Sequence, residues 1–239
     1  MAHRYYLDAP LGQSTQVVLA GSEAQHLIRV MRAECGDVVE VFDGTGWQWN
    51  AAVRELRRNE ATLEILSGEQ VDREADISLT IALAIPKGDR QKWIIEKLVE
   101  LGVRKVIPLV TDRGVVQPAE KTRSRLQKHV LSSSKQCGRN RLLEIGLTES
   151  FSGLLQRQAG HRLIAHPSSA EGGKEGMNIR DFKLQEKEIL VAIGPEGGFT
   201  AEEIQHALDQ QWSMVDLGPR ILRIETAAVA LAAQMLLGV

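Results

Sequence analysis

The stretch Ile193–Thr200, with the sequence IGPEGGFT, decides the fold of this chain together with a second loop, Leu217–Ala227, with the sequence LGPRILRIETA. Each loop follows an apolar run that predicts a buried strand, Ile189–Ile193 and Met214–Leu217, and each leads into a helical pattern. The carboxyl ends of parallel strands meet at one edge of a sheet, where glycine lets the main chain approach a ligand closely. The two loops therefore predict a binding site at a sheet edge.

Ordinary strand-to-helix turns are the alternative interpretation of these loops, because Gly and Pro are common turn residues. Two Gly-Pro loops, one of which carries Arg220, Arg223 and Glu225 close together, favour a site. Neither a GxGxxG fingerprint nor a GK[ST] phosphate loop occurs anywhere in the chain. We therefore expect a ligand other than NAD or ATP.

An alternation of strands and helices surrounds the two loops from about residue 75 onward. Thr200 and Glu203 form a capping-box pattern, which predicts a helix directly after the first loop. The almost wholly apolar segment Ala227–Leu237 predicts a last helix that is buried or lies in a subunit interface. The other expected strands are Leu79–Ile85, Lys105–Leu109, Leu142–Gly146 and Arg162–His166, and the other expected helices are Arg90–Leu101 and Glu120–Gln136.

A shorter, strand-like period marks the residues before this α/β part. Short alternating segments broken by Gly, Asn and Asp, with one short helix at Glu23–Met31, predict a small β-barrel. The charged linker Val71–Ile77 is the expected boundary, which gives domains over residues 1–72 and 73–239. The expected strands of the barrel are Val17–Ala20, Asp37–Phe42, Gly46–Leu56 and Ala61–Leu66.

The composition of the chain is typical of a cytoplasmic protein with its own hydrophobic core. It has 239 residues and is 43% hydrophobic. Its two cysteines, Cys35 and Cys137, stand far apart without a CxxC or Cys/His cluster, so we expect neither a disulfide framework nor a metal site. No apolar run approaches the ~20 residues that span a bilayer, and the first residues lack a signal-peptide core. We expect a cytoplasmic location and no membrane partner.

Basic residues are concentrated locally although the net charge is −2. Residues 121–141 contain seven Lys and Arg and no acid, and a second basic row follows helical spacing near residues 26–32. Each row by itself could be a solvated helix face, but two acid-free patches in an acid-rich chain favour a local RNA surface. The candidate RNA-binding residues are Arg4, His26, Arg29, Arg32, Arg123, Arg125, Arg139, Asn140 and Arg141.

The loops resemble those of the SPOUT superfamily of S-adenosylmethionine-dependent RNA methyltransferases. Within it, they resemble the ribosomal small-subunit RNA uracil-N3 methyltransferases, whose hallmarks are a GPEGG loop and the sequence LGxRILRxETA. Lys135 departs from the family pattern, which usually has Glu before Gln136. The resemblance extends to His26–Arg32, Gly36-Asp37, Asp43-Gly44, Glu100–Val103 and Gln136–Asn140.

This resemblance implies an α/β fold with two domains. A SPOUT domain over residues 73–239 would carry a parallel sheet with a trefoil-knotted S-adenosylmethionine site, and would form a homodimer. A PUA-like β-barrel over residues 1–72 would bind RNA. The expected substrate is a specific uridine of 16S ribosomal RNA in the assembled small ribosomal subunit, methylated at N3.

The resemblance also implies which residues hold the cofactor. Backbone groups of the two glycine loops would hold adenine and ribose, Leu222 would pack on the base, and the end of the strand before Pro167 would form a third wall. The candidate cofactor-binding residues are His166, Pro167, Ile193, Gly194, Pro195, Glu196, Gly197, Leu217, Gly218, Leu222 and Arg223.

Methylation of uracil at N3 needs a deprotonated nitrogen. The acidity of N3–H is comparable with that of Tyr, so an ordinary Glu base would face a gap of roughly 7 to 8 kcal/mol. An Arg beside the uracil carbonyls would stabilise the anion, and desolvation would make Glu a stronger base. We therefore select Arg220, Arg223 and Glu225 as catalytic candidates, with Glu225 either taking the proton or orienting an Arg. Alternatively, Arg223 and Glu225 only pair at the start of the last helix.

Two other functions stay open on the sequence alone. One is a SPOUT methyltransferase of other specificity, for example at the ribose 2′-O of transfer RNA, which would use similar loops. The other is a non-catalytic RNA-binding assembly factor with the same fold. Binding of S-adenosylmethionine and the identity of a methylated product separate the three.

Overall fold

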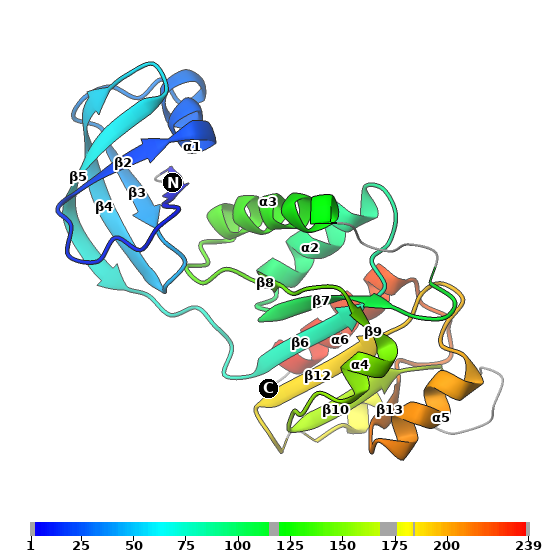
Figure 1. The fold of residues 1–239 in the computed structure, drawn as a ribbon. Helices are drawn as coiled ribbons and strands as arrows, with labels where there is room; N and C mark the ends of the chain where they lie inside the picture. Colours follow the sequence, from blue (N-terminus) through cyan, green and yellow to red (C-terminus); the bar gives the residue numbers. More distant parts are fainter. Residues whose placement is uncertain (1–2, 115–119, 168–175, 184, 238–239) are drawn as a thin grey trace. The chain divides into compact units, whose positions relative to one another are not determined.

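The chain forms two compact units in a computed structural model that describes residues 3–114, 120–167, 176–183 and 185–237 (Figure 1). The first unit contains Met1–Glu74 together with Leu131–Leu142, and the second contains Ala75–Val130 together with Leu143–Val239. The sequence predicts a single division between residues 72 and 73. The structure joins residues 131–142 to the N-terminal part, so the first unit consists of two separate stretches of chain.

A curled five-stranded sheet forms most of the first unit (Figure 1). The strand order is β1-β3-β4-β5-β2; β1 and β3 are parallel and the other pairs are antiparallel. The sheet encloses a core in which Tyr5, Leu27 and Leu63 are fully buried. This agrees with the expected PUA-like barrel. The strands are β1 Arg4–Tyr6, β2 Gln16–Ala20, β3 Val38–Phe42, β4 Trp47–Leu56 and β5 Glu60–Gln70.

The helix predicted over Glu23–Met31 consists of two short helices of different kinds. The α-helix α1, Gly21–Gln25, runs directly into the π-helix η1, His26–Val30. Ala24 and Leu27, which follow each other at helical spacing, are buried against the sheet. The helical signal was thus correct, whereas the wider turn of a π-helix has no signature in the hydrophobic period.

Hydrogen bonds attach residues 131–142 to the first unit. These residues include the last turns of α3, Glu120–Cys137. Arg4 Nη1 donates to the carbonyl oxygen of Ser134 over 3.0 Å, and the amide of Asn140 donates to Gln48 Oε1 over 3.0 Å. Arg139 Nε donates to Glu74 Oε1 over 2.8 Å. Polar groups this well paired explain why the segment belongs to the barrel although it is distant in sequence.

A parallel sheet organises the second unit. Its strand order is β11-β13-β10-β12-β6-β7-β8, with β9 paired to β7 beside this path, and every recorded pair is parallel. The strands are β6 Ser78–Leu83, β7 Lys105–Val110, β8 Glu144–Ile145, β9 Glu149–Ser150, β10 His161–Ala165, β11 Met177–Asn178, β12 Glu188–Ile193 and β13 Ser213–Asp216.

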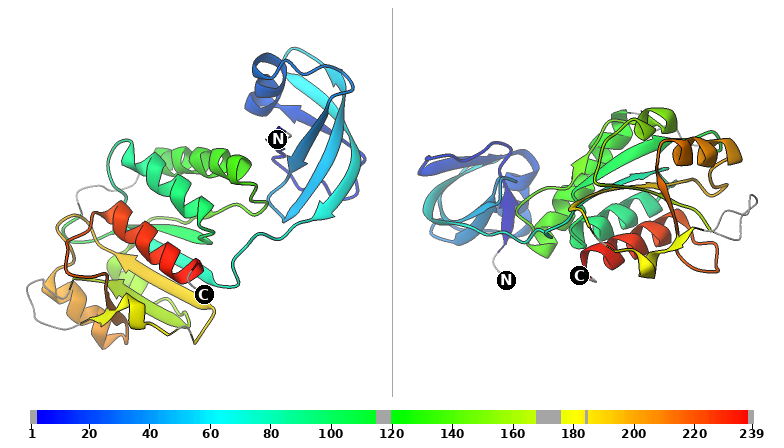
Figure 2. Two further views of the ribbon diagram at one scale, coloured as in Figure 1. Left: turned by 180° about the vertical axis from the view of Figure 1, so that it is seen from behind. Right: turned by 90° about the horizontal axis from the view of Figure 1, so that it is seen from below.

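Helices cover both faces of this sheet (Figure 2). The helices α2, Arg90–Glu100, and α6, Ile224–Leu236, pack on each other and lie on one face. On the other face, α4, Phe151–Leu155, and α5, Ala201–Asp209, enclose a core with the strands. A short 3-10 helix, Ile179–Asp181, follows β11. This confirms the α/β prediction and places the two glycine loops at the carboxyl ends of β12 and β13. The trefoil knot stays a prediction.

The described helices also bear on membrane contact. None of them combines the length and the apolarity that crossing a bilayer requires. Within the same residues, no three His, Cys, Asp or Glu side chains gather as a metal site would require.

Candidate functional site

A cavity opens at the carboxyl ends of β10, β12 and β13. These three strands are neighbours in the parallel sheet. Ligands of open α/β sheets bind at the carboxyl ends of such strands. All the cofactor-binding candidates line this cavity except Gly197 and Arg223. Its other lining residues are Ala165, Gly198, Asp216, Arg220, Ile221, Ile224 and Ala227.

The first glycine loop is held rigidly against its surroundings. A Cβ atom at Gly194 would approach the ring of Phe199 to 3.1 Å, so glycine allows the close packing of strand on ring. The predicted capping box is present: Thr200 and Glu203 exchange hydrogen bonds between side chain and main chain. Glu203 also accepts a hydrogen bond from the main-chain nitrogen of Asp112 over 3.0 Å. The loop therefore presents a preformed wall to the cavity.

The second glycine loop turns sharply at Gly218. Its φ of +107° lies in the region that L side chains rarely adopt, and its nitrogen donates to Asp216 Oδ1 over 2.9 Å. Arg220 lines the cavity and is exposed, whereas Arg223 is the exposed N-cap residue of α6. Ile221 is 84% exposed at the cavity edge. Both arginines can thus reach solvent beside the cavity.

His166 lines the wall that β10 contributes. The main-chain nitrogen of His166 donates to the carbonyl oxygen of Val215 over 3.0 Å. Burial lowers the pKa of the His166 imidazole below its usual 6.5, and the nearby Asp216 carboxylate offsets part of this effect. The ring is therefore neutral at pH 7, which suits a wall and not a cationic contact.

Glu225 is the most buried charged candidate of the site. It is 8% exposed in the first turn of α6, and its Oε2 atom makes no hydrogen bond. The ion pair of Glu225 is with Arg90, whose Nη1 lies 3.7 Å from Oε2. Nη2 of the same guanidinium lies 3.2 Å from Glu196 Oε1. Arg90 has no signal in the sequence, because its contacts depend on how α2 packs against α6.

A second cavity, of about 200 Å³, adjoins the first. The two share Pro195, Glu196 and Ile224, so these residues form a common wall. The second cavity is otherwise lined by Ala84, Ile85, Pro86, Lys87 and Gly114. Its position at the ends of β6 and β7 continues the same sheet edge.

Three of the candidate RNA-binding residues serve as internal contacts of the first unit. Arg139 is 3% exposed and forms an ion pair with Glu74, and Asn140 is 1% exposed. Arg4 is bonded to Glu40, to Asn140 and to the main chain of Ser134. A buried, fully bonded group cannot reach a phosphate without breaking these contacts, so we do not propose these three as RNA contacts.

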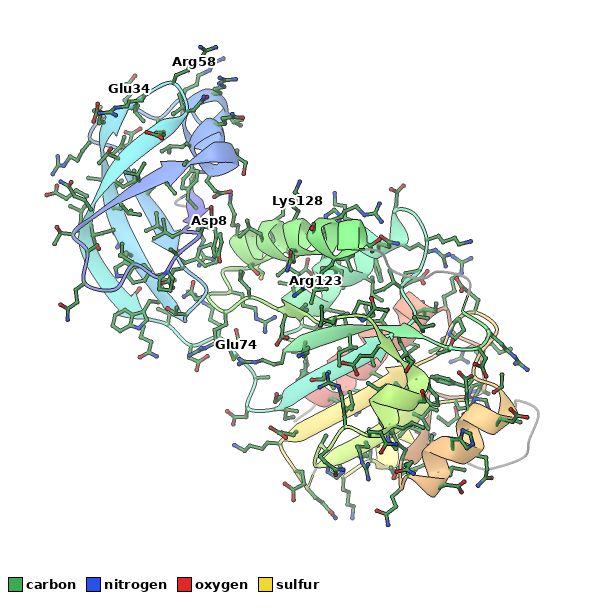
Figure 3. All side chains as sticks on the ribbon, in the orientation of Figure 1. Asp8, Glu34, Arg58, Glu74, Arg123 and Lys128 are labelled. Atoms are coloured by element: carbon green, nitrogen blue, oxygen red, sulfur yellow. The ribbon has the colours of Figure 1, made fainter. Side chains whose placement is uncertain are left out.

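The remaining candidates differ in exposure. In the second unit, Arg123 Nε donates to the carbonyl oxygen of Ile145 and Arg125 is bonded to Gln91, while their neighbour Lys128 is exposed (Figure 3). In the first unit, His26 is partly buried and Arg141 packs over Gly46. Arg29 and Arg32 are exposed and have no partner among the described residues. These two are the free cations of the set.

Lys135, which departs from the family pattern, makes contacts within the first unit. Its Nζ lies 2.9 Å from both carboxylate oxygens of Glu23 and 5.4 Å from the centroid of the Tyr5 ring. Glu23 in turn accepts a hydrogen bond from the main-chain nitrogen of Tyr6. The lysine thus joins α3 to the barrel within the first unit.

Comparison with protein families gives two matches. The RNA methyltransferase domain family matches residues 73–236, and the RNA methyltransferase PUA domain family matches residues 19–66. Ribosomal RNA small subunit methyltransferase E of Bacillus subtilis is 30% identical over 235 residues, which cover 94% of this chain and 92% of that protein. The protein of the same name from Synechocystis is 31% identical over 98% of this chain and 77% of its own length.

Solved structures give the same relationship. The structure of ribosomal RNA small subunit methyltransferase E from Neisseria gonorrhoeae bound to S-adenosyl methionine has a TM-score of 0.86 and 31% identity, covering 98% of this chain and 97% of that chain. A putative methyltransferase from Legionella pneumophila in complex with the cofactor SAM has a TM-score of 0.89 and 28% identity, covering 98% of both chains. Both units of the fold therefore have close structural relatives.

Proposed function

Since the chain belongs to the RNA methyltransferase family that includes ribosomal RNA small subunit methyltransferase E, we propose that it transfers a methyl group from S-adenosylmethionine to N3 of a specific uridine in 16S ribosomal RNA. Because it belongs to this family, the chain is an S-adenosylmethionine-dependent ribosomal RNA methyltransferase. The methylated atom and the form of the substrate are the finer parts of the proposal. The observation that carries it is the convergence of both glycine loops on one cavity, with the buried Glu225 directly after Ile224, which lines that cavity.

The residues around the first cavity fit S-adenosylmethionine. Ile193, Leu217 and Leu222 supply apolar walls for adenine, and the loop main chain supplies hydrogen-bonding groups at its edge. A Cβ atom at Gly218 would meet nothing within 4 Å, so the turn leaves open space beside it. The carboxylates of Glu196 and Asp216 face a cofactor that carries a positive sulfonium. The shape, polarity and charge of the first cavity therefore all suit S-adenosylmethionine.

The bound cofactor supplies an electrophilic methyl group. Transfer of this methyl group would break the uracil N3–H bond, form an N3–CH₃ bond and leave a neutral thioether. Glu225 takes the proton from N3, because it is buried and has one carboxylate oxygen without a hydrogen bond. Arg220, which lines the cavity, and the exposed Arg223, which lies next to the lining residues Leu222 and Ile224 in sequence, stabilise the negative charge on the uracil carbonyl oxygens.

RNA recognition is proposed for the first unit. A PUA-type barrel offers a surface for RNA, and Arg29 and Arg32 provide exposed cations for phosphate contacts. We further propose that the chain works in the cytoplasm on the small ribosomal subunit, as a homodimer through its second unit. The exposed Trp93 of α2 and Leu237 after α6 support such an interface.

Methyl transfer to defined RNAs tests the proposed function. Labelled S-adenosylmethionine would be supplied with small ribosomal subunits that lack the modification, with naked 16S ribosomal RNA, and with transfer RNA as the specificity control. Mass spectrometry of the nucleosides would identify the product. We expect 3-methyluridine, and more of it from the subunit than from naked RNA. A ribose-methylated nucleoside, or transfer to transfer RNA alone, would contradict the proposal.

A further inference from the structure

The second cavity lies at the reaction site but takes no part in the cofactor site described above. It shares Pro195, Glu196 and Ile224 with the first cavity. Its volume of about 200 Å³ is many times the ~15 Å³ of comparable space that one water needs. A group the size of a pyrimidine ring can therefore enter it and lie next to whatever occupies the first cavity.

The walls of this cavity are apolar and fixed. Ala84, Ile85 and Pro86 are buried at the end of β6, and Ile224 is buried at the start of α6. The amide of the buried Gln91 donates to the carbonyl oxygen of Pro86 over 2.7 Å, which holds that wall in place. Apolar walls suit the two faces of a planar ring, so the ligand would be recognised at its edge.

Charge at the common wall is the second observation. The Glu196 and Glu225 carboxylates are both paired with Arg90. Two negative charges against one guanidinium leave an excess of one negative charge, which would oppose an anionic ring. Lys87 lines the cavity, and its ammonium group has no ion-pair partner among the described residues. The Lys87 ammonium neutralises the excess negative charge of Glu196, Glu225 and Arg90, and it remains available to contact a ligand.

We propose that the second cavity receives the target uracil, turned out of the RNA, and that the Lys87 ammonium contacts a carbonyl oxygen of the ring as N3 loses its proton. This inference rests on the proposed function. Enzymes that act on a base commonly extrude it into such a pocket. The negative charge of uracilate is shared with the carbonyl oxygens, so the exposed Lys87 ammonium at the cavity wall stabilises it as it forms.

The test compares Lys87→Met with Lys92→Met. Both substitutions remove an ammonium, but Lys92 is an exposed residue of α2 paired with Glu96 and lines neither cavity. With small ribosomal subunits as substrate, we expect Lys87→Met to lower kcat about 100-fold. Affinity for S-adenosylmethionine, measured by calorimetry, should stay within about twofold of wild type, because Lys87 does not line the first cavity. Lys92→Met should behave as wild type. A kcat of Lys87→Met within threefold of wild type would overturn the inference.

A substrate with a more acidic N3 separates charge stabilisation from damage to the fold. Subunits from cells grown with 5-fluorouracil carry 5-fluorouridine, whose N3 loses its proton more readily. We expect the deficit in kcat of Lys87→Met relative to wild type to be at least tenfold smaller with this substrate, since the anion then needs less stabilisation. A misfolded variant would fail equally on both substrates, and equal deficits on both would contradict the role of Lys87. Wild-type protein without 3-methyluridine product would instead refute the proposed function itself.

Discussion

At the scale of single residues, Glu225 has the environment of a base. Its carboxylate is buried, is oriented by Arg90 and keeps Oε2 without a hydrogen bond. We expect Glu225→Gln to lower single-turnover methyl transfer by about 10² or more, because the amide cannot accept the proton. Affinity for S-adenosylmethionine should be preserved in calorimetry. Glu202→Gln, at an exposed position of α5, is the matched control. Near-normal turnover of Glu225→Gln would remove Glu225 from the catalytic residues.

Gly218 gives a second prediction at this scale. Its φ of +107° strains any L side chain, and an added Cβ would enter the open space of the first cavity. Gly218→Ala should weaken S-adenosylmethionine binding about tenfold in titration calorimetry. Gly12→Ala controls for strain, because Gly12 has a φ of +59° with open space around it in the other unit. Equal cofactor affinity of both variants would show that Gly218 does not shape the cofactor site.

The sequence predicted residue positions where the main chain decides them. Most loop residues selected as cofactor contacts line the first cavity, because strand ends fix where their backbone lies, and their role stays a prediction. Arg90, Lys87 and the burial of Arg139 could not be predicted in this way. Each depends on which side chain an element distant in sequence brings nearby, and a charged residue carries the same sequence signal whether it is exposed or paired.

At the scale of elements, the attachment of residues 131–142 to the barrel is testable. Arg139 and Glu74 form a pair whose side chains are 4% and 15% exposed. Arg139→Met leaves Glu74 without its partner, so we expect a loss of about 3 kcal/mol in the free energy of unfolding. Urea denaturation followed by a signal of the first unit would measure it. Arg29→Met should leave stability unchanged and weaken RNA binding; the reverse pattern would restore Arg139 as an RNA contact.

Elements with a long, regular pattern were predicted closely, whereas several of the short ones were missed. α2, α3 and β12 match the expected ranges within a few residues. The two- and three-residue strands β1, β9 and β11 and the five-residue helix α4 were missed, because too few residues repeat to show a period. The last helix begins at Ile224 and not at Ala227, since its polar first turn interrupts the apolar run.

At the scale of the whole molecule, one buried group in each unit should make stability depend on pH, Tyr5 on the alkaline side and His166 on the acid side. Burial, aided by the Glu23 carboxylate, raises the pKa of Tyr5 in the first unit to about 12. The unfolded chain ionises its Tyr near pH 10, so stability is complete below pH 10 and is lost as the pH rises towards 12, by up to about 3 kcal/mol. Tyr5→Phe should abolish this loss in alkaline denaturation experiments.

The second unit has the opposite dependence through His166. Because burial lowers the pKa of His166, the unfolded chain takes up the proton first. This contribution to stability is complete above pH 6.5 and is lost as the pH falls from 6.5 through the lowered value. His166→Gln should reduce the loss of stability on the acid side, to which His26 and His129 also contribute because burial lowers their pKa values, and should leave the alkaline side unchanged. Parallel changes on both sides would contradict independent titration of the two units.

The division of the first unit into two stretches of chain has a consequence for inheritance. Residues 131–142 reach the barrel only after the chain has passed through residues 75–130 of the other unit. A gene exchange with one crossover point within residues 75–130 would pair a barrel from one parent with the Arg139–Asn140 segment of another, and would separate partners such as Glu74 and Arg139. Recombination that moves an intact barrel must therefore exchange two segments at once or carry residues 75–130 with it, which ties the ancestry of the first unit to that of the second.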